Sequence, residues 1–255
     1  MLLKSNQFYD LLSSDFDLMI SWEKRLKVEA PFFEKIFREN KVKKILDLAC
    51  GTGKHSIFFA KCGYEVTGVD NSRKMIEIAK KSTRGLYTVK FIKANFLVVY
   101  PRVKEKFDAI ICLGNSLPHL LSKNALRKTL QNIGKLLNPE GIVIFQNRNY
   151  DKILSQNLRF MSPNITFRKN ERIIFFRVLD FCKNKIIFNL VTYREKGGVW
   201  SFQTKSTFLR PIMVKEIEGI LRILNFTDLK FFGDYKSNPY RKKTSEDLIL
   251  FARKG

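Results

Sequence analysis

The chain has 255 residues and a mass of 29.9 kDa, with 45% hydrophobic and 28% charged residues. This balance excludes a disordered or fibrous chain and fits one domain with an insertion, or two small domains. With 47 Lys and Arg against 24 Asp and Glu, the formal net charge is +23. That charge admits nucleic acid as a partner without favouring it, because the basic residues are scattered and form no typical nucleic-acid-binding motif.

The sequence shows no feature of a membrane, secreted or metal-binding protein. Its apolar stretches are too short to cross a bilayer, and the first residues lack the apolar region of a secretion signal. The four cysteines form no CxxC pair and have no ligand spacing with the two histidines. We therefore expect a cytoplasmic protein with free thiols, no membrane association and no metal.

The first forty residues are predicted to be helical, with a bend at Pro31. From residue 41 onward, short apolar strands alternate with amphipathic helices, a pattern typical of right-handed crossovers and a parallel sheet. The predicted strands are Ile45–Ala49, Glu65–Val69, Thr88–Ile92, Phe107–Leu113 and Ile142–Asn147, and the predicted helices are His55–Lys61, Arg73–Lys81 and Ala125–Leu137.

The pattern changes after Asp151 to three strands of period two, joined by short turns, which indicates an antiparallel meander. A helix and two further strands follow. The predicted segments are Ile173–Phe181, Lys185–Arg194, Val199–Leu209, Pro211–Leu224, Leu229–Phe232 and Leu248–Ala252. We expect a helical cap at residues 1–40, an α/β domain at 41–151 and 211–255 with a mostly parallel seven-stranded sheet, and an antiparallel β insertion at 152–210.

The most informative segment runs from a strand that ends in Asp47 into Gly51-Thr-Gly53 and a helix. Glycines at this point let the backbone approach a ligand closely. A dinucleotide-binding loop would need a third glycine where Ser56 stands, and Asp47 would repel a pyrophosphate. A cationic ligand is the better match. The segment resembles the S-adenosylmethionine (SAM) loop of class I methyltransferases, which implies a Rossmann-like fold with helices on both faces of the sheet.

Two later strand ends fit the same resemblance. Asp70 ends the second strand, where the family holds the ribose hydroxyls; a helix N-cap is the alternative reading. Asn95 and Phe96 follow the third strand, where the family recognises adenine; a turn asparagine is the alternative. The resemblance further implies cofactor contacts from a small set of neighbouring positions, namely Ala49, Gly51, Gly53, Asn71 and Leu113.

The fourth and fifth strands narrow the resemblance. The sequence Leu113-Gly-Asn-Ser116 with His119, and Asn147-Arg-Asn-Tyr-Asp151 after the next strand, are similar to the glycine and sarcosine N-methyltransferases. This likeness implies that Asn115 lies beside the acceptor amine or the methionine part of SAM. It also implies that Arg148 grips an acceptor carboxylate with its planar guanidinium. A surface arginine at a strand end is the alternative for Arg148.

Four further positions match that group more loosely. Tyr9 and Arg25 lie in the N-terminal helices, which cover SAM and bind its carboxylate in relatives. Tyr193 lies on the meander, in the place of a lid tyrosine that reaches the substrate. His119 either lines the substrate site or is a structural histidine.

We therefore predict a SAM-dependent methyltransferase, with S-adenosylhomocysteine as product, that acts on a small molecule. The expected acceptor is the nitrogen of an amino acid or another carboxylate-bearing amine. The net charge leaves an RNA methyltransferase as an alternative. Asn95 stands where the family has an acid, which leaves a non-catalytic SAM-binding regulatory domain as a further alternative.

Overall fold

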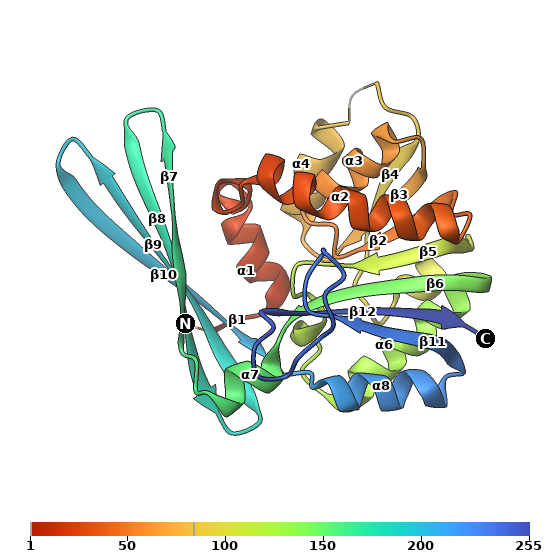
Figure 1. Cartoon of the computed structure of the whole chain (residues 1–255). Helices are drawn as coiled ribbons and strands as arrows, with labels where there is room; N and C mark the ends of the chain where they lie inside the picture. The colour runs from red at the N-terminus through yellow and green to blue at the C-terminus, as the bar shows by residue number, and fades with distance from the viewer. Residues whose placement is uncertain (1, 84) are drawn as a thin grey trace.

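The structure is a computed structural model that describes residues 2–83 and 85–255, and its strands form two sheets (Figure 1). The larger sheet has seven strands, of which β12 alone runs antiparallel to its neighbours. In spatial order they are β11 (Phe226–Phe232), β12 (Asp247–Lys254), β6 (Leu137–Arg148), β5 (Phe107–Cys112), β2 (Lys44–Leu48), β3 (Glu65–Asp70) and β4 (Val89–Lys93).

Helices cover both faces of this sheet. One face packs against α2 (Trp22–Glu39), α3 (Lys54–Lys61) and α4 (Arg73–Lys81), and the other against α6 (Lys123–Leu136) and α8 (Val214–Ile223) (Figure 1). A strand covered on both faces needs a continuous apolar run rather than an alternating one. In β2, consecutive Ile45 and Leu46 are both fully buried, which matches this requirement. The predicted Rossmann-like fold class is confirmed.

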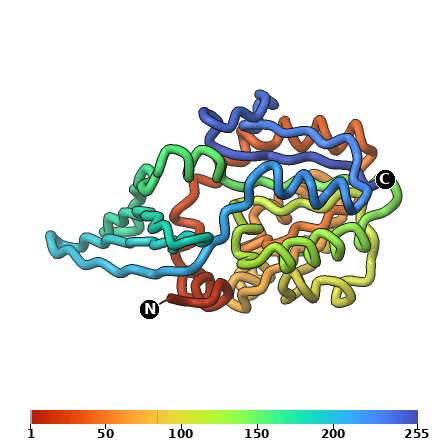
Figure 2. The backbone as a smooth tube through the Cα atoms, turned by 90° about the horizontal axis from the view of Figure 1, so that it is seen from below, coloured from red at the N-terminus to blue at the C-terminus, as the bar shows by residue number. Residues whose placement is uncertain are grey.

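The smaller sheet is an antiparallel meander with a short parallel strand at its edge. It contains β1 (Leu2–Leu3), β10 (Val199–Leu209), β9 (Lys185–Lys196), β8 (Glu171–Cys182) and β7 (Phe160–Arg168), in that spatial order. Helix α1 (Ser5–Leu12) packs Phe8 and Leu12 against the inner face of this sheet. Figure 2 shows that the β9–β10 hairpin projects away from the doubly wound body.

The structure departs from the predicted segments at several elements, three of which concern the meander and the N-terminal residues. It has a fourth meander strand, β7, and a short helix α7 (Tyr150–Ser155), neither of which was predicted. In addition, residues 1–40 do not pack as one cap. Helix α1 belongs to the core of the meander, whereas α2 buries Phe33 and Phe37 against the large sheet. A 3-10 helix, η1 (Phe16–Met19), separates the two helices.

The topology decides where a site can form. Strands β2 to β6 are parallel, so their carboxyl ends meet at one edge of the sheet, and the chain reversals there leave a crevice. Helix α1 and the meander lie across this same edge (Figure 1). Within the described residues, no helix has the length and apolar character needed to span a membrane.

Candidate functional site

The loop after β2 is bent by residues in the left-handed backbone region. Ala49 has φ of 60°, Gly51 of 57° and Gly53 of 80°. The bend turns the Gly51 N–H toward Asp70 at the end of β3, and it donates to Asp70 Oδ2 over 2.9 Å. Asp70 Oδ1 accepts from the Ser72 N–H over 2.7 Å. One carboxylate thus connects the glycine loop with the start of α4.

Asp70 is not the N-cap of α4. The N-cap is Ser72, whose hydroxyl accepts from the Met75 N–H over 3.1 Å. Burial raises the pKa of Asp70 to about 6, against the opposing effect of the backbone N–H groups that donate to it. Its carboxylate lines the cavity beside the loop, so the cap alternative does not account for it.

A second buried acid lies on the neighbouring strand. Asp47 is 2% exposed, and its Oδ2 accepts from the Ser56 hydroxyl over 2.6 Å. Burial raises the pKa of Asp47, and the nearby His55 opposes that shift. Ser56, which replaces the third glycine of a dinucleotide loop, is therefore the partner of this acid. Two adjacent carboxylates at the strand ends favour a cationic ligand over a pyrophosphate.

Gly53 has a packing role. A Cβ atom built there would lie 2.6 Å from Phe91 Cζ and 3.0 Å from Ala79 Cβ. Gly53 is not among the residues that line the cavity, whereas Gly51 is. The cofactor contact at Gly53 stays a prediction, and the packing adds a structural requirement: only glycine lets α3 start this close to α4 and β4.

The N-terminal segment forms the wall opposite the loop. Tyr9, Phe16, Trp22 and Arg25 all line the cavity. The segment is attached to the glycine loop by Asp17, whose Oδ1 accepts from the Thr52 hydroxyl over 2.7 Å and from Trp22 Nε1 over 2.9 Å.

Arg25 is oriented by a buried acid. Its Nε donates to Glu29 Oε1 over 2.7 Å, and Glu29 Oε2 lies 2.6 Å from His55 Nε2. Burial alone would raise the pKa of Glu29, but its hydrogen bonds with His55 and Arg25 hold that pKa below its usual range. The guanidinium also lies 5.4 Å from the centroid of the Trp22 ring. Arg25 is thus fixed at the cavity wall, as the predicted contact to a ligand carboxylate requires.

The far end of the cavity lies at the loop after β4. Asn95, Phe96 and Leu97 line it. Asn95 Oδ1 accepts from the backbone N–H groups of Leu97 and Val98, over 2.9 and 3.2 Å. This is the turn role that was considered as the alternative. It leaves the amide NH₂ of Asn95, and the backbone of Phe96, for a ligand.

The cavity enclosed by these segments measures about 270 Å³. Ten of the eleven predicted cofactor-binding residues line it, all but Gly53: Tyr9, Arg25, Asp47, Ala49, Gly51, Asp70, Asn71, Asn95, Phe96 and Leu113. The residues fit SAM because buried carboxylates face a cationic ligand with ribose hydroxyls, and a fixed guanidinium is available for its carboxylate.

A second cavity of about 590 Å³ adjoins the first and shares five residues with it: Tyr9, Phe16, Arg25, Gly114 and His119. Asn115 lies there with φ of 64°. Its Nδ2 donates to the Tyr150 hydroxyl over 3.0 Å, and its Oδ1 accepts from the Arg148 N–H over 3.0 Å. These contacts hold the Asn115 amide rigidly between β5 and β6.

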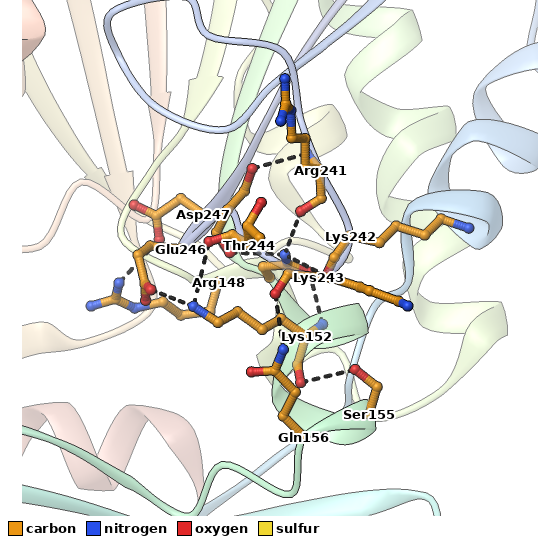
Figure 3. Close-up of polar contacts among 12 residues, drawn as sticks. Arg148, Lys152, Ser155, Gln156, Arg241, Lys242, Lys243, Thr244, Glu246 and Asp247 are labelled. Atoms are coloured by element: carbon orange, nitrogen blue, oxygen red, sulfur yellow. Dashed lines mark hydrogen bonds and ion pairs between the residues drawn. The ribbon is translucent and has the colours of Figure 1, made fainter.

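Arg148 ends β6 directly opposite Asp247, the first residue of β12. Its Nη1 donates to Asp247 Oδ1 over 3.1 Å (Figure 3). The segment 241–247 is fastened over α7, where Gln156 donates to the Lys243 carbonyl over 2.9 Å (Figure 3). Burial raises the pKa of Asp247, and the charge of Arg148 opposes this. The guanidinium therefore has a fixed position on the wall of the second cavity.

Two neutral groups stand where the cavities meet. The Tyr9 hydroxyl lies 3.0 Å from His119 Nε2. Burial lowers the pKa of His119 to about 4 and raises the pKa of Tyr9. At pH 7 neither side chain is charged, so this junction holds a short polar pair without a strong base.

Tyr193 does not lie at either cavity. Its ring packs against Phe202, with centroids 6.0 Å apart, on the part of the meander away from the described lining residues. Neighbouring residues of a strand face opposite sides, and Thr192 rather than Tyr193 is buried, so the substrate contact of Tyr193 stays a prediction that this arrangement does not support.

Sequence reasoning missed three residues of the second cavity: Tyr150, Arg177 and Asp247. Arg177 carried a usable signal, because it occupies the apolar face of a predicted strand. Asp247 carried none, since its partnership with Arg148 depends on the antiparallel pairing of β12 with β6, which are about a hundred residues apart in sequence.

Comparison with known proteins agrees with this geometry. The family described as "Methyltransferase domain" matches residues 45–141. The chain is 37% identical over 250 residues to the glycine/sarcosine N-methyltransferase of Aphanothece halophytica, covering 98% of this chain and 90% of that protein. It is 32% identical to the glycine/sarcosine N-methyltransferase of Parasynechococcus marenigrum (strain WH8102), covering 90% and 79%.

Solved structures share the fold at lower identity. A SAM-dependent methyltransferase from Clostridium acetobutylicum ATCC 824 superposes with a TM-score of 0.76 at 20% identity, over 98% of both chains. An amino pentose methyltransferase from Micromonospora echinaspora, solved with SAM bound, gives a TM-score of 0.72 at 14% identity, over 92% of both chains.

Proposed function

We propose that this chain, which belongs to the SAM-dependent methyltransferase family of the glycine/sarcosine N-methyltransferases, methylates the nitrogen of an amino acid or a similar carboxylate-bearing amine. That it is a methyltransferase follows from the family. The acceptor is our proposal. The observation that supports it best is the fixed guanidinium of Arg148 on the wall of a cavity that adjoins the cofactor cavity.

When bound, SAM supplies a methyl group on a positively charged sulfur. The residues proposed to hold it are Asp70 at the ribose, Arg25 at the carboxylate and the Asn95–Phe96 turn at the adenine. Asp47 contributes negative charge near the glycine loop. All of them are fixed by hydrogen bonds within the chain, so little reorganisation is needed on binding.

On the acceptor side, Arg148 binds the carboxylate and Asn115 fixes the distance between that carboxylate and the amine. An amine can attack only in its neutral form. Burial lowers the pKa of His119 to about 4, so its imidazole is neutral at pH 7 and too weak a base to take a proton from the acceptor's ammonium group. The acceptor is therefore proposed to lose its proton to solvent before it reaches the junction, where the apolar and neutral lining favours the uncharged amine.

The experiment that tests the proposal uses SAM labelled in its methyl group. The protein is incubated separately with glycine, with sarcosine, with a small-molecule fraction of cell extract and with an RNA fraction. We expect label in glycine, sarcosine or another carboxylate-bearing amine. Label confined to RNA would overturn the proposed acceptor, and tight SAM binding without any S-adenosylhomocysteine would instead indicate a regulatory SAM-binding protein.

A further inference from the structure

Arg177 occupies an unusual place in strand β8. The inner face of this strand presents Ile173, Phe175 and Leu179, which are at most 1% exposed. Arg177 stands on the same face by the period of two, and its partner in β9, Leu190, is also buried. The side chain lines the second cavity together with Tyr9 and Arg148. A guanidinium thus lies among apolar residues, next to the arginine proposed to bind the acceptor.

The charge of Arg177 has no acidic partner among residues 2–83 and 85–255. Every other arginine of that cavity is paired: Arg25 with Glu29, and Arg148 with Asp247. Within the part of the chain that the structure describes, Arg177 donates to the neutral amide oxygen of Asn164 alone. Burial, followed by the charge of Arg148, lowers its pKa. A partly buried cation without a counter-ion destabilises the folded chain, unless a ligand supplies the opposite charge.

We propose that Arg177 is a specificity-determining residue that binds the acidic group of the acceptor jointly with Arg148. Arg148 and Arg177 together carry two positive charges, and Asp247 offsets one of them. One further negative charge, supplied by the acceptor, would balance the two guanidinium groups. The acceptor class is accordingly an amine with a single acidic group, held between β6 of the large sheet and β8 of the meander. This inference rests on the proposed function, because it names the second contact of the same acceptor.

The placement also gives the meander a function. Arg148 and Arg177 come from different sheets, so an acidic group bound by both connects the meander with the doubly wound domain. An amine without an acidic group would leave Arg177 without a counter-ion. Discrimination against such amines follows from the cost of that unpaired charge.

The test compares three variants with the wild type. Arg177→Met removes the charge and keeps much of the side-chain volume, and Arg177→Lys keeps the charge without the planar fork. The matched control is Arg172→Met on the same strand, where the exposed guanidinium lies over the Phe167 ring on the outer side. The measurements are KM for glycine and sarcosine, the dissociation constant of S-adenosylhomocysteine, and Tm.

We expect Arg177→Met to raise KM for the acceptor about tenfold or more, with an unchanged S-adenosylhomocysteine affinity and a Tm that does not fall. Arg177→Lys should recover part of the loss, and Arg172→Met should behave as the wild type. An acceptor KM within twofold of wild type in Arg177→Met would overturn the inference. So would a drop in Tm with weaker S-adenosylhomocysteine binding, which would indicate a structural role.

A separate measurement keeps this inference distinct from the proposed function. Calorimetry with the S-adenosylhomocysteine complex measures binding of acetate and, as the uncharged counterpart, acetamide. If the protein methylates no amino acid, but acetate binds and the Arg177→Met variant loses that binding, the proposed function fails and the acidic-group site stands. If acetate binds neither protein, or binds both equally, the inference is wrong.

Discussion

Asp70 combines a structural role with a proposed binding role in one side chain. Its two oxygens accept from Gly51 and Ser72, and the same carboxylate faces the cavity. The ionised form is needed to accept further hydrogen bonds from ribose hydroxyls. Because burial raises the pKa of Asp70 to about 6, its carboxyl changes between the ionised and the protonated form within the pH range of ordinary buffers.

The affinity for SAM should therefore depend on pH through Asp70. Below about pH 6 the carboxyl takes up a proton and loses acceptor capacity, so the dissociation constant should rise by up to about tenfold per pH unit. Calorimetry between pH 5 and 8 measures this. Because the pKa of Asp70 is higher in the folded chain than in the unfolded chain, protonation of this carboxyl stabilises the folded state. Weaker SAM binding at low pH would therefore not result from unfolding caused by the protonation of Asp70. An Asp70→Asn variant should bind weakly without that pH dependence; an unchanged pH dependence would contradict the assignment.

Arg148 makes the second prediction at this scale. Replacing it by Ala should raise KM for the acceptor about 30-fold or more, because a charged hydrogen-bonded pair is lost, while SAM affinity stays the same. Asp247→Asn, which keeps the guanidinium but weakens its orientation, should give an intermediate KM. Steady-state kinetics with glycine and sarcosine measure both, and equal effects of Arg148→Ala on SAM and acceptor binding would argue for general loss of structure.

Among the elements, the start of α3 is the most constrained by packing. Gly53 is left-handed, and a Cβ there would collide with Phe91 and Ala79. Gly63 at the end of the same helix is also left-handed, with φ of 94°, but has open space around it. Substitutions at these two positions therefore distinguish the cost of backbone strain, present at both, from the cost of crowding, present at Gly53.

We expect Gly63→Ala to lower the free energy of unfolding by about 1 kcal/mol, from the strained backbone alone. Gly53→Ala should lower it by about 3 kcal/mol, because overpacking against β4 is added to the same strain. Urea denaturation of both variants measures the difference. Equal losses would show that Phe91 moves aside without cost.

Strand β7 escaped prediction for a physical reason. Strand β7 is an edge strand with Phe160 and Phe167 largely exposed and Pro163 within it, so it lacks the regular burial that produces a period of two. Strand β10 (Val199–Leu209), which pairs with β9 along its whole length, was predicted to the residue. Helix α4 (Arg73–Lys81), with its serine N-cap, was as well.

For the whole molecule, the charge of +23 predicts electrostatic attraction to polyanions without sequence recognition. Binding of a single-stranded RNA should weaken at least about tenfold between 50 and 200 mM salt. Methyl transfer to a small acceptor should persist over that range, because the proposed site makes only a few charged contacts. Filter binding and the labelled-SAM assay measure the two. RNA methylation that survives 200 mM salt would favour the RNA alternative.

The sequence alone was sufficient for the fold class and the cofactor class, and ten of its eleven predicted cofactor-binding residues line the first cavity. These depend on local features: apolar runs for strands covered on both sides, glycines at a bend, and acids placed at the ends of consecutive strands. Since parallel strands bring their carboxyl ends to one edge, Asp47, Asp70 and Asn95 had to lie close together once the strands were recognised.

The second cavity, where we propose that the acceptor binds, was decided by tertiary structure. Asp247 faces Arg148 only because β12 pairs with β6, and Arg177 reaches the same cavity only because the meander folds its inner face over α1 toward the large sheet. The same packing divides residues 1–40 between two cores and turns Tyr193 away from the site. Contacts between segments a hundred residues apart have no local signature, because they are selected by the combined burial of surfaces that form only when the elements pack.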